Sequence, residues 1–304
     1  MTNRKVCIVG VGKIAQDQHV PAIDASPDWE LAATVSRAGS VEGVPIFRDF
    51  DVMLAERDDI EVVSLCLPPQ PRFQYARKAL KAGRHLMLEK PPGQTLAEVE
   101  HLKRLAAEAG VTIFATWHSR MGKGVAGAKA WLAGQEVTGG RITWKEDVRH
   151  WHPGQEWVFS PGGMGVFDPG INALSILTEI LPKPVHVTEA VLDYPEGRDA
   201  PIAASLRFTR GITMDLDWLQ TGPQTWDIEV ETTTGRVKLG SGGNELWIDG
   251  APQPVSETEE YPALYARMAR LVDEGRSDVD LMPMTHVADA MTLGRRITVE
   301  PFAF

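Results

Sequence analysis

The sequence is poor in cysteine, in basic residues and in long apolar runs, and each shortage excludes a class of protein. Only Cys7 and Cys66 occur, each inside a short apolar run, so we expect buried thiols in a reducing compartment and no disulfide framework. No stretch approaches the roughly 18 apolar residues of a membrane span, and the N-terminus lacks a signal-peptide pattern. We therefore expect a cytoplasmic protein without a membrane partner.

The charge balance is acidic. The chain has 31 Lys and Arg against 41 Asp and Glu, which gives a net charge of −10 at pH 7. This balance disfavours a general nucleic-acid-binding surface. The remaining composition, 43% hydrophobic and 24% charged, is that of a folded globular protein, and 304 residues exceed the usual size of one domain.

The first 120 residues alternate short apolar runs with amphipathic ones. Strand and helix in strict rotation predict a doubly wound parallel sheet covered by helices on both faces, as in a Rossmann fold. The expected strands are 5–10, 31–36, 60–67, 85–89 and 111–116, and the clearest helices are 71–82 and 95–109. The second of these helices opens on Thr95, with Glu98 three residues later, and stops at Gly110.

The pattern changes near residue 120, which predicts a Rossmann domain over 1–120 and an α+β domain over 121–304 for substrate binding and oligomerisation. The second half is expected to form an open, mainly antiparallel sheet. Its expected strands are 141–148, 201–209, 211–219, 226–232 and 245–249, and its expected helices are 123–133, 170–181, 261–274 and 284–297. The flat face of such a sheet could pair with a second copy, so a homo-oligomer is expected.

A glycine-rich loop follows the first strand. Gly10, Gly12 and Ala15 fit the GxGxx(G/A) pattern, which lets a pyrophosphate approach the backbone at the start of a helix. The alternative is a turn that only links strand to helix. The second strand ends at Ser36 and Arg37, a hydroxyl and a guanidinium in place of the usual carboxylate, which favours NADP, with NAD also accepted. The alternative for Arg37 is a solvated loop residue.

A lysine stands at the carboxyl end of the strand 85–89. Lys90 follows Glu89 and precedes two prolines, which prevent the strand from continuing. Ligands of doubly wound sheets bind beyond the carboxyl ends of the strands, so Lys90 can face a bound nicotinamide and shuttle a proton there. The alternative is a side chain that reaches solvent.

Four motifs resemble the glucose–fructose oxidoreductase/inositol dehydrogenase family. They are VGVGKIA at 9–15, CLPP at 66–69, LEKPP at 88–92 and GGMGVFDPGIN at 162–172. The resemblance covers essentially the whole chain and implies a Rossmann domain joined to an open-sheet domain. The expected cofactor-binding residues are Gly10, Gly12, Lys13, Ile14, Ala15, Ser36, Arg37, Pro68, Glu89 and Lys90.

Three further segments resemble the bacterial aldose 1-dehydrogenases of this family that act on L-arabinose and D-galactose. They are KIAQDQHVPAI at 13–23, WKEDVRHWHPGQEW at 144–157 and FDPGINALSI at 167–176. This resemblance implies oxidation of an aldopyranose at C1 to the lactone by hydride transfer to nicotinamide. Two alternatives remain open: a non-catalytic regulator that senses sugar and NAD(P), and an NAD-dependent glycosidase of the same superfamily.

The catalytic residues are expected to be Lys90, Asp168 and Asn172. Many family members have Asp and His four residues apart in this motif, whereas this chain has Asp168 and Asn172. An Asn side chain cannot take a proton, so the base is Asp168 or Lys90, and Asn172 orients the substrate. The alternative for Asp168 is a helix N-cap, because Pro169 follows it.

A segment rich in Trp and His offers groups that suit a sugar. Carboxylate, imidazole and amide groups fix hydroxyls, and aromatic faces cover the C–H surface of the ring. The expected substrate contacts are His118, Glu146, Trp151, His152, Asp168, Asn172 and Trp226. No HExxH or Cys/His spacing supports a metal, so none is expected. The alternative to a sugar-binding role is a purely structural one, in which the segment is an ordinary strand followed by a Trp-anchored loop.

Overall fold

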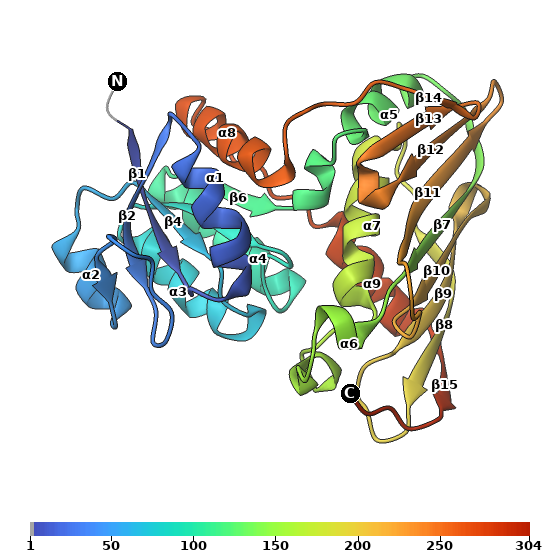
Figure 1. The fold of residues 1–304 in the computed structure, drawn as a ribbon, viewed down its shortest axis with the longest axis horizontal. Helices are drawn as coiled ribbons and strands as arrows, with labels where there is room; N and C mark the ends of the chain where they lie inside the picture. Colours follow the sequence, from blue (N-terminus) through green and yellow to red (C-terminus); the bar gives the residue numbers. More distant parts are fainter. Residues whose placement is uncertain (1–2) are drawn as a thin grey trace. The chain divides into compact units, whose positions relative to one another are not determined.

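The structure is a computed structural model that describes residues 3–304 and divides the chain into two compact units (Figure 1). Unit 1 consists of the chain up to His118 together with Thr258–Leu281, and unit 2 consists of Ser119–Glu257 together with Met282–Phe304. The sequence analysis placed 258–281 in the second domain, but this segment packs in unit 1. An amphipathic pattern shows that a helix has a buried face and does not show which core buries it.

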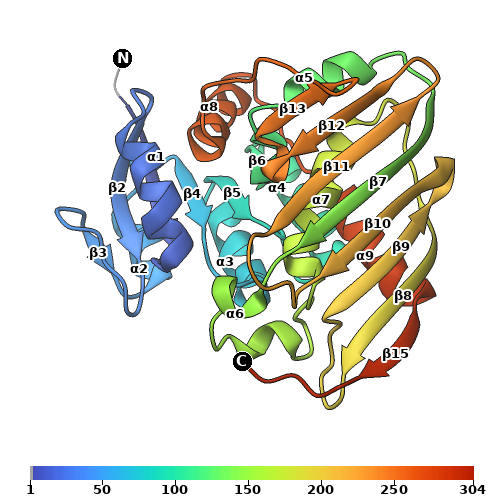
Figure 2. The same ribbon diagram turned by 45° about the vertical axis from the view of Figure 1, so that its right-hand side comes forward.

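Unit 1 contains the expected doubly wound sheet. All neighbouring strands pair in parallel, and the order β3-β2-β1-β4-β5-β6 reverses between β1 and β4 (Figure 2). The strands are β1 Arg4–Val9, β2 Trp29–Val35, β3 Ile46–Phe47, β4 Val62–Leu65, β5 His85–Glu89 and β6 Ile113–Thr116. Only the two-residue strand β3 was not predicted.

Except for α8, which belongs to 258–281, the helices of unit 1 lie between these strands in the sequence. They are η1 Ala15–His19, a π-helical turn that continues into α1 Val20–Asp24, then α2 Phe50–Glu56, α3 Pro69–Lys81, α4 Leu96–Ala109 and α8 Glu260–Asp273. The predicted ends of α4 are confirmed. The Thr95 side chain accepts a hydrogen bond from the Glu98 N–H at 3.2 Å, and Gly110 ends the helix in the left-handed conformation.

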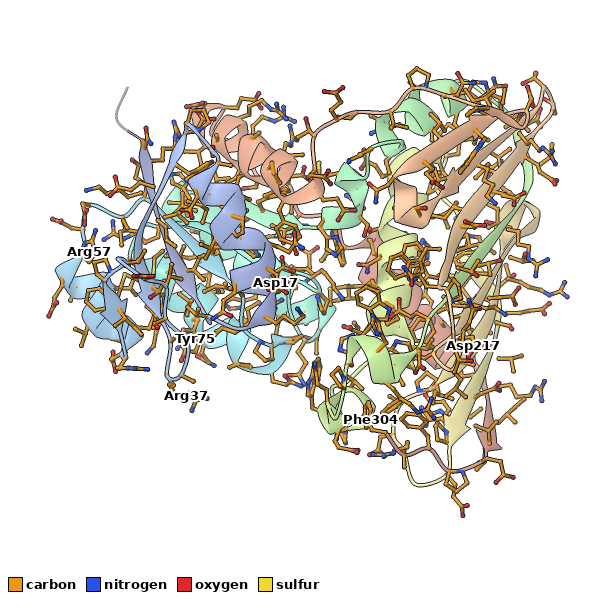
Figure 3. All side chains as sticks on the ribbon, in the orientation of Figure 1. Asp17, Arg37, Arg57, Tyr75, Asp217 and Phe304 are labelled. Carbon is orange, nitrogen blue, oxygen red and sulfur yellow. The ribbon has the colours of Figure 1, made fainter. Side chains whose placement is uncertain are left out.

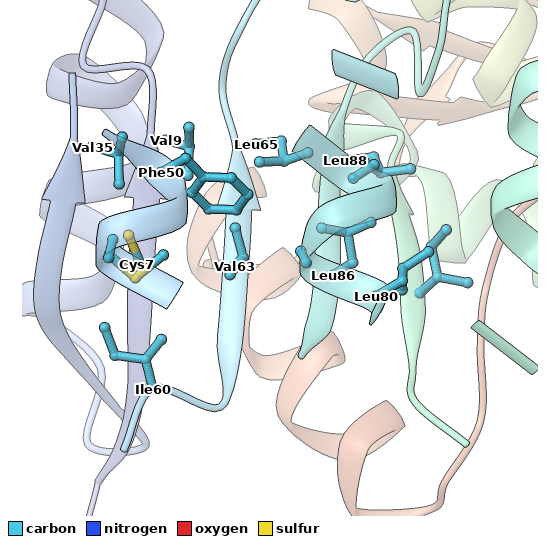
Figure 4. Close-up of a cluster of buried hydrophobic side chains, with 14 of the residues drawn as sticks. Cys7, Val9, Val35, Phe50, Ile60, Val63, Leu65, Leu80, Leu86 and Leu88 are labelled. Carbon is cyan, nitrogen blue, oxygen red and sulfur yellow. The ribbon is translucent and has the colours of Figure 1, made fainter. Parts of the chain in front are cut away.

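The two faces of this sheet have different partners. Successive side chains of a strand point to opposite faces, so Cys7, Val9, Leu86 and Leu88 share one buried cluster with residues of α2, α3 and α4 (Figure 4). Glu89 belongs to the opposite register. It therefore faces the side of η1, α1 and α8, where apolar packing alone cannot satisfy a carboxylate.

The returning segment is attached to the free edge of the sheet. The Ala115 N–H donates to the Asp278 carbonyl at 2.9 Å, and the Asp278 N–H donates to the Ile113 carbonyl at 3.0 Å. These bonds continue the sheet beyond β6 and leave α8 packed beside α1. Backbone pairing thus joins two parts of the chain that are more than 140 residues apart.

Unit 2 is built on a nine-stranded, mostly antiparallel sheet in the order β14-β13-β12-β11-β7-β10-β9-β8-β15, with parallel pairs at β7–β10 and β8–β15. Its strands are β7 Val137–Lys145, β8 Val187–Pro195, β9 Ala203–Phe208, β10 Ile212–Asp217, β11 Thr225–Thr232, β12 Arg236–Gly240, β13 Glu245–Ile248, β14 Ala251–Pro252 and β15 Arg295–Val299. This confirms the predicted fold class.

Helices cover one face of this sheet (Figure 2). They are α5 Val125–Leu132, α6 Val148–Trp151, α7 Phe167–Ile180 and α9 Met282–Leu293, with short 3₁₀ turns η2 His118–Met121, η3 Glu156–Phe159, η4 Thr209–Gly211 and η5 Ser241–Gly243. Helix α7 is buried along almost its whole length, which makes it the centre of the unit. No helix within residues 3–304 is both long and apolar enough to cross a membrane.

Most predicted elements of unit 2 differ from the observed bounds by one or two residues, and three differ by more. The helix expected at 284–297 ends at Leu293, and β15 follows because its residues pair with β8, which a local pattern cannot show. The strand expected at 141–148 begins at Val137 and includes Gly140, where a side chain would meet the Glu229 carbonyl at 2.7 Å. The helix expected at 170–181 begins at Phe167, since proline is tolerated in a first turn.

The thiols of the two cysteines are both free, but they differ in exposure. Cys7 is buried in the cluster described above, and burial raises its pKa because the thiolate would be desolvated. Cys66 is only partly buried, which corrects the expectation of two core thiols. Its strand, β4, ends at Leu65, so Cys66 already lies in the loop.

Replacement of Leu86 by Ala should lower the free energy of unfolding by about 2–5 kcal/mol, because the fully buried side chain would leave a cavity. Urea unfolding followed by circular dichroism measures the change. Val52→Ala is the control, since Val52 is 44% exposed in the same unit and its loss should change stability by less than about 0.5 kcal/mol. A loss below about 1 kcal/mol for Leu86→Ala would contradict the packing described here.

Candidate active site

The glycine-rich loop after β1 has the geometry that a pyrophosphate needs. Gly10 has φ +92°, and a Cβ there would lie 2.8 Å from the Leu67 side chain, so only glycine fits. A Cβ at Gly12 would have no atom within 4 Å, so open space lies over the backbone at this point. Lys13 and Ile14 are exposed and Ala15 is buried, so the loop turns its backbone and two side chains outward. These residues fit a dinucleotide.

The loop after β2 is ordered by backbone contacts. The Ser36 hydroxyl accepts a hydrogen bond from the Gly39 N–H at 3.0 Å, and Arg48 donates to the carbonyls of Ser36, at 2.9 Å, and Arg37. The Arg37 side chain is exposed and projects outward from this loop (Figure 3). Sequence reasoning missed Arg48, because its partners are carbonyls eleven and twelve residues away.

The expected cofactor residues of unit 1 come from the carboxyl ends of neighbouring strands. The loops that follow β1, β2, β4 and β5 contribute Gly10–Ala15, Ser36–Arg37, Pro68 and Lys90 respectively. Pro68 is exposed directly before α3, and Lys90 is partly buried. Because parallel strands all end at one edge, the sheet brings these positions to the same edge, at the point where the strand order reverses.

Glu89 is 5% exposed and its carboxylate is held by groups of unit 1. One oxygen, Oε1, bonds to His19 Nε2 at 3.0 Å and accepts from the Tyr261 hydroxyl at 2.9 Å. The other oxygen, Oε2, accepts from the Lys90 backbone N–H at 2.9 Å. His19 Nδ1 also bonds to the Tyr265 hydroxyl at 2.9 Å. We call these residues, Glu89, His19, Tyr261 and Tyr265, the Glu89 network.

Arg72 supports the same loop from within the protein. Its side chain is 2% exposed, and its guanidinium donates to the carbonyls of Leu67, Glu89 and Pro91. Burial lowers the pKa of Arg72 to about 10. Lys90 is therefore flanked by two carbonyls that Arg72 holds, while Glu89 holds its N–H. The Lys90–Pro91 peptide bond is cis.

The electrostatics of the Glu89 network favour an ion pair. Burial by itself would raise the pKa of Glu89, but the hydrogen bond from His19 and the charges of His19, His118 and Arg72 lower it to about 2. Burial likewise opposes the charged form of His19, yet the fields of Cys66 and Tyr265 and the hydrogen bond to Glu89 raise its pKa well above the usual value. A protonated imidazole has a donor on each nitrogen, which matches its two partners.

His118 follows β6, as expected, and its ring is oriented by helix α8. Its Nδ1 lies 2.6 Å from Glu260 Oε2, and its ring stacks on Tyr261 with the centroids 5.7 Å apart. Tyr261 in turn donates to Glu89. The structure thus connects His118 to the residues around Lys90 through α8, a helix that the sequence analysis assigned to the other domain.

Unit 2 contains a second buried carboxylate, Glu146, which follows β7 and is 4% exposed. Its Oε1 accepts from the indole N–H of Trp218 at 3.1 Å, and its Oε2 accepts from that of Trp226 at 2.9 Å. Trp226 stacks on Trp144 with ring centroids 5.6 Å apart. Glu146 therefore fixes two indole rings. The sequence analysis missed Trp218, although it continues the alternation of β10 beyond Asp217.

His152 and Asp168 meet in the same unit. His152 Nε2 lies 3.3 Å from Asp168 Oδ2, and the His152 ring packs against Trp218 at 5.3 Å. Trp151, which is 42% exposed, packs against Trp226 at 5.4 Å. A continuous set of contacts therefore joins five of the expected substrate residues, Glu146, Trp151, His152, Asp168 and Trp226, through Trp218.

Asp168 and Asn172 lie four residues apart on α7, so they share a face of that helix. The N-cap alternative for Asp168 is wrong, because the helix begins at Phe167 and its N-cap is Val166, which makes no side-chain cap bond. Asp168 is 8% exposed and paired with an imidazole, an arrangement that can hold and transfer a proton. Among residues 3–304, no group of three or more His, Cys, Asp or Glu side chains has a geometry that could hold a metal ion.

Replacement of Glu89 by Gln should lower the free energy of unfolding by about 3 kcal/mol near pH 6, because His19 loses its buried anion. The pKa of Glu89 is lowered to about 2, so its contribution is complete above its unfolded value of 4.5 and fades as the pH falls toward 2. The pKa of His19 is raised, so its contribution is complete below 6.5 and fades as the pH rises through the folded value.

Urea unfolding of the wild type and of Glu89→Gln between pH 3 and pH 8 measures the two free energies of unfolding. The difference between their free energies of unfolding should shrink as the pH falls below about 4.5. Glu100→Gln is the control, since its ion pair with Lys103 is exposed and its loss should cost less than about 1 kcal/mol. A difference that stays constant across the acid range would contradict a buried ion pair at Glu89.

Comparison with known proteins identifies relatives along nearly the whole chain. A family model described as "Oxidoreductase family, NAD-binding Rossmann fold" matches residues 4–116. Galactose 1-dehydrogenase of Pseudomonas fluorescens is 40% identical over 300 residues, which are 97% of each chain. The crystal structure of D-galactose-1-dehydrogenase from Rhizobium etli is 51% identical, with a TM-score of 0.95, and the match covers 100% of this chain and 99% of the other.

A more distant relative, D-xylose 1-dehydrogenase (NADP(+)) 2 of Haloferax volcanii, is 25% identical over 89% of each chain. The family motifs in the sequence, the Rossmann sheet of unit 1 and these full-length similarities agree. The chain therefore belongs to the oxidoreductase family with an NAD-binding Rossmann fold that includes glucose–fructose oxidoreductase and inositol dehydrogenase.

Proposed function

We propose that the protein is an NAD(P)-dependent aldose 1-dehydrogenase that oxidises D-galactose at C1 to the lactone, with L-arabinose as a second substrate. The similarity to two galactose 1-dehydrogenases over almost the full chain supports the substrate. The observation that carries the proposal is the set of contacts around Glu146, which groups indole faces, an imidazole and a carboxylate in unit 2. Such groups suit a pyranose, with its hydroxyls and its apolar C–H faces.

The proposed roles follow from the chemistry of each side chain. When bound, the nicotinamide supplies the acceptor for the hydride that leaves C1. Asp168 takes the proton of the C1 hydroxyl, and the pairing with His152 stabilises its orientation. Lys90 is the second proposed proton-transferring group, and Asn172 orients a hydroxyl of the sugar. His118, Glu146, Trp151 and Trp226 complete the proposed sugar contacts.

Glu89 is also among the proposed cofactor residues, because it fixes the loop that begins at Lys90. Its oxygens bind protein groups, including the Lys90 N–H, so we infer that it acts on the cofactor by fixing Lys90. A regulator without catalysis would need neither a held lysine nor an Asp–His pair. A glycosidase that reoxidises its own cofactor would release sugar without net cofactor reduction.

Replacement of Lys90 by Met or of Asp168 by Asn should lower kcat for D-galactose about 10²–10⁴-fold, because each change removes a proton-transferring group. The assay follows NADPH absorbance with D-galactose, L-arabinose and D-xylose. Lys103→Met and Asp215→Asn are matched controls, because both side chains form surface ion pairs. Absence of reduced cofactor with every aldose would contradict the proposed function, and full activity of either site variant would contradict its role.

Replacement of Arg37 by Ala should raise the KM for NADP at least about tenfold, because the guanidinium is the proposed partner of the 2′-phosphate. The KM for NAD should stay within about twofold, since NAD lacks this phosphate. Steady-state kinetics with both cofactors at saturating galactose give the two values. Equal changes for NAD and NADP would refute a specific role of Arg37.

The remaining properties are inferences of the same kind. We propose a cytoplasmic enzyme that assembles as a homo-oligomer through the face of the unit 2 sheet that its helices leave free. Its partner is then a small sugar, with no nucleic acid involved, in accordance with the net charge of −10.

A further inference from the structure

The last residues of the chain pack against the loop that carries Trp151 and His152. Phe302 is 8% exposed, and its ring lies 5.4 Å from that of Phe159 and 5.3 Å from that of Phe304. The Arg149 guanidinium of α6 lies 4.8 Å above the Phe302 ring, a distance suited to a cation–π contact. The end of the chain lies beside α6 in both ribbon views (Figures 1 and 2), and the view with side chains labels Phe304 at this end (Figure 3).

Arg198 adds a polar attachment to this packing. Its Nη2 donates to the Phe302 carbonyl at 3.1 Å, its guanidinium lies 5.6 Å from the centroid of the Phe159 ring, and it forms an ion pair with Glu156. One arginine thus binds the C-terminal segment and η3 at the same time. We call residues 300–304 the C-terminal segment and residues 148–160 the sugar loop.

Two short paths of contacts lead from the C-terminal segment to the proposed sugar residues. On one path the Phe159 ring, 1% exposed, packs 5.5 Å from Trp218, whose ring contacts His152 and whose N–H binds Glu146. On the other path Arg149 lies in the same helical turn as Trp151. Displacement of Phe302 would therefore disturb both ends of the sugar loop.

The sugar loop has little internal support of its own. Helix α6 and the 3₁₀ turn η3 have four residues each, too few to be stable without packing. Two of its indoles are exposed, Trp151 at 42% and Trp157 at 37%, so they contribute little burial. Besides buried Val148 and Val158 and the contacts of Trp151 and His152 described above, the contacts at Phe159 and Arg149 help to fix its conformation, and these two are the ones that the C-terminal segment makes.

We propose that the C-terminal segment anchors the sugar loop and that Phe302 is a positioning residue for the binding of sugar. Phe302 acts through Phe159 and Arg149 and touches neither substrate nor cofactor. The sugar part of this inference rests on the proposed function, whereas the anchoring of the loop does not.

The test compares Phe302→Ala with the wild type in the full-length protein. Hydrogen exchange of peptides from 148–160 should accelerate at least about tenfold, because the loop opens locally more often. The KM for D-galactose should rise several-fold, whereas the KM for NADP should stay within about twofold, because the cofactor residues lie in unit 1. Phe302→Leu should give exchange rates and a KM for D-galactose between those of the wild type and Phe302→Ala, since it keeps apolar contact and loses the ring.

Two further variants keep the test informative if Phe302→Ala folds poorly. Arg149→Gln removes the cation above the Phe302 ring together with a partly exposed ion pair to Asp147, and the Arg149 side chain is 44% exposed, so the variant should fold and show the same changes in weaker form. Leu293→Ala is the control, because Leu293 is 55% exposed at the end of α9 and should change neither exchange nor KM. Thermal unfolding of each variant separates local loosening from global loss of stability.

The outcomes distinguish the two proposals. Unchanged exchange over 148–160 in Phe302→Ala and Arg149→Gln would overturn the anchoring. Faster exchange with an unchanged KM for galactose would overturn the positioning role, as would equal increases in the KM for galactose and for NADP. If the wild type oxidised no aldose, the proposed function would fail, and the exchange measurement would still decide whether the segment anchors the loop.

Discussion

A buried carboxylate at the end of a core strand determines the arrangement of unit 1. The alternation of β5 directs Glu89 away from the leucine cluster and onto the face of η1 and α8. An anion there is costly unless it is paired and hydrogen-bonded. His19 and Tyr261 satisfy one oxygen, and the Lys90 N–H binds the other. The same interaction therefore joins the helix after the glycine-rich loop, the returning segment 258–281 and the residue that we propose as catalytic.

Unit 2 follows a similar principle with different partners. Glu146 also follows a strand onto the covered face of a sheet, and two indole N–H groups compensate its charge. In both units the buried carboxylate orders the groups around it through both of its oxygens. The side chains proposed to meet the substrate are Lys90 in unit 1 and Asp168 in unit 2, and each lies close to one of these ordered groups.

The features that the sequence predicted correctly depend on short-range patterns. The cap at Thr95 and the stop at Gly110 are local chemistry, and both are present. Strand β5 was predicted with its observed bounds because an apolar run met two prolines. Motif resemblance placed the chain in its family, and the chemistry that a sugar needs singled out Glu146, Trp151 and His152, which the structure joins to Asp168 by contacts in unit 2. The N-cap, which was the alternative for Asp168, is wrong, since proline suits several positions of a first turn.

By itself, the sequence determined the fold class, the glycine-rich loop after β1 and the position of the lysine after β5, because periodicity, turn residues and strand order act over a few residues. Only the tertiary structure decided that 258–281 returns to the first sheet, that 295–299 is a strand, that His19 and Arg72 hold the residues around Lys90 in unit 1, and that Trp218 binds Glu146 in unit 2. These facts depend on which distant group satisfies a buried polar atom or an open sheet edge. A buried charge requires a partner, but the sequence around it does not show which one.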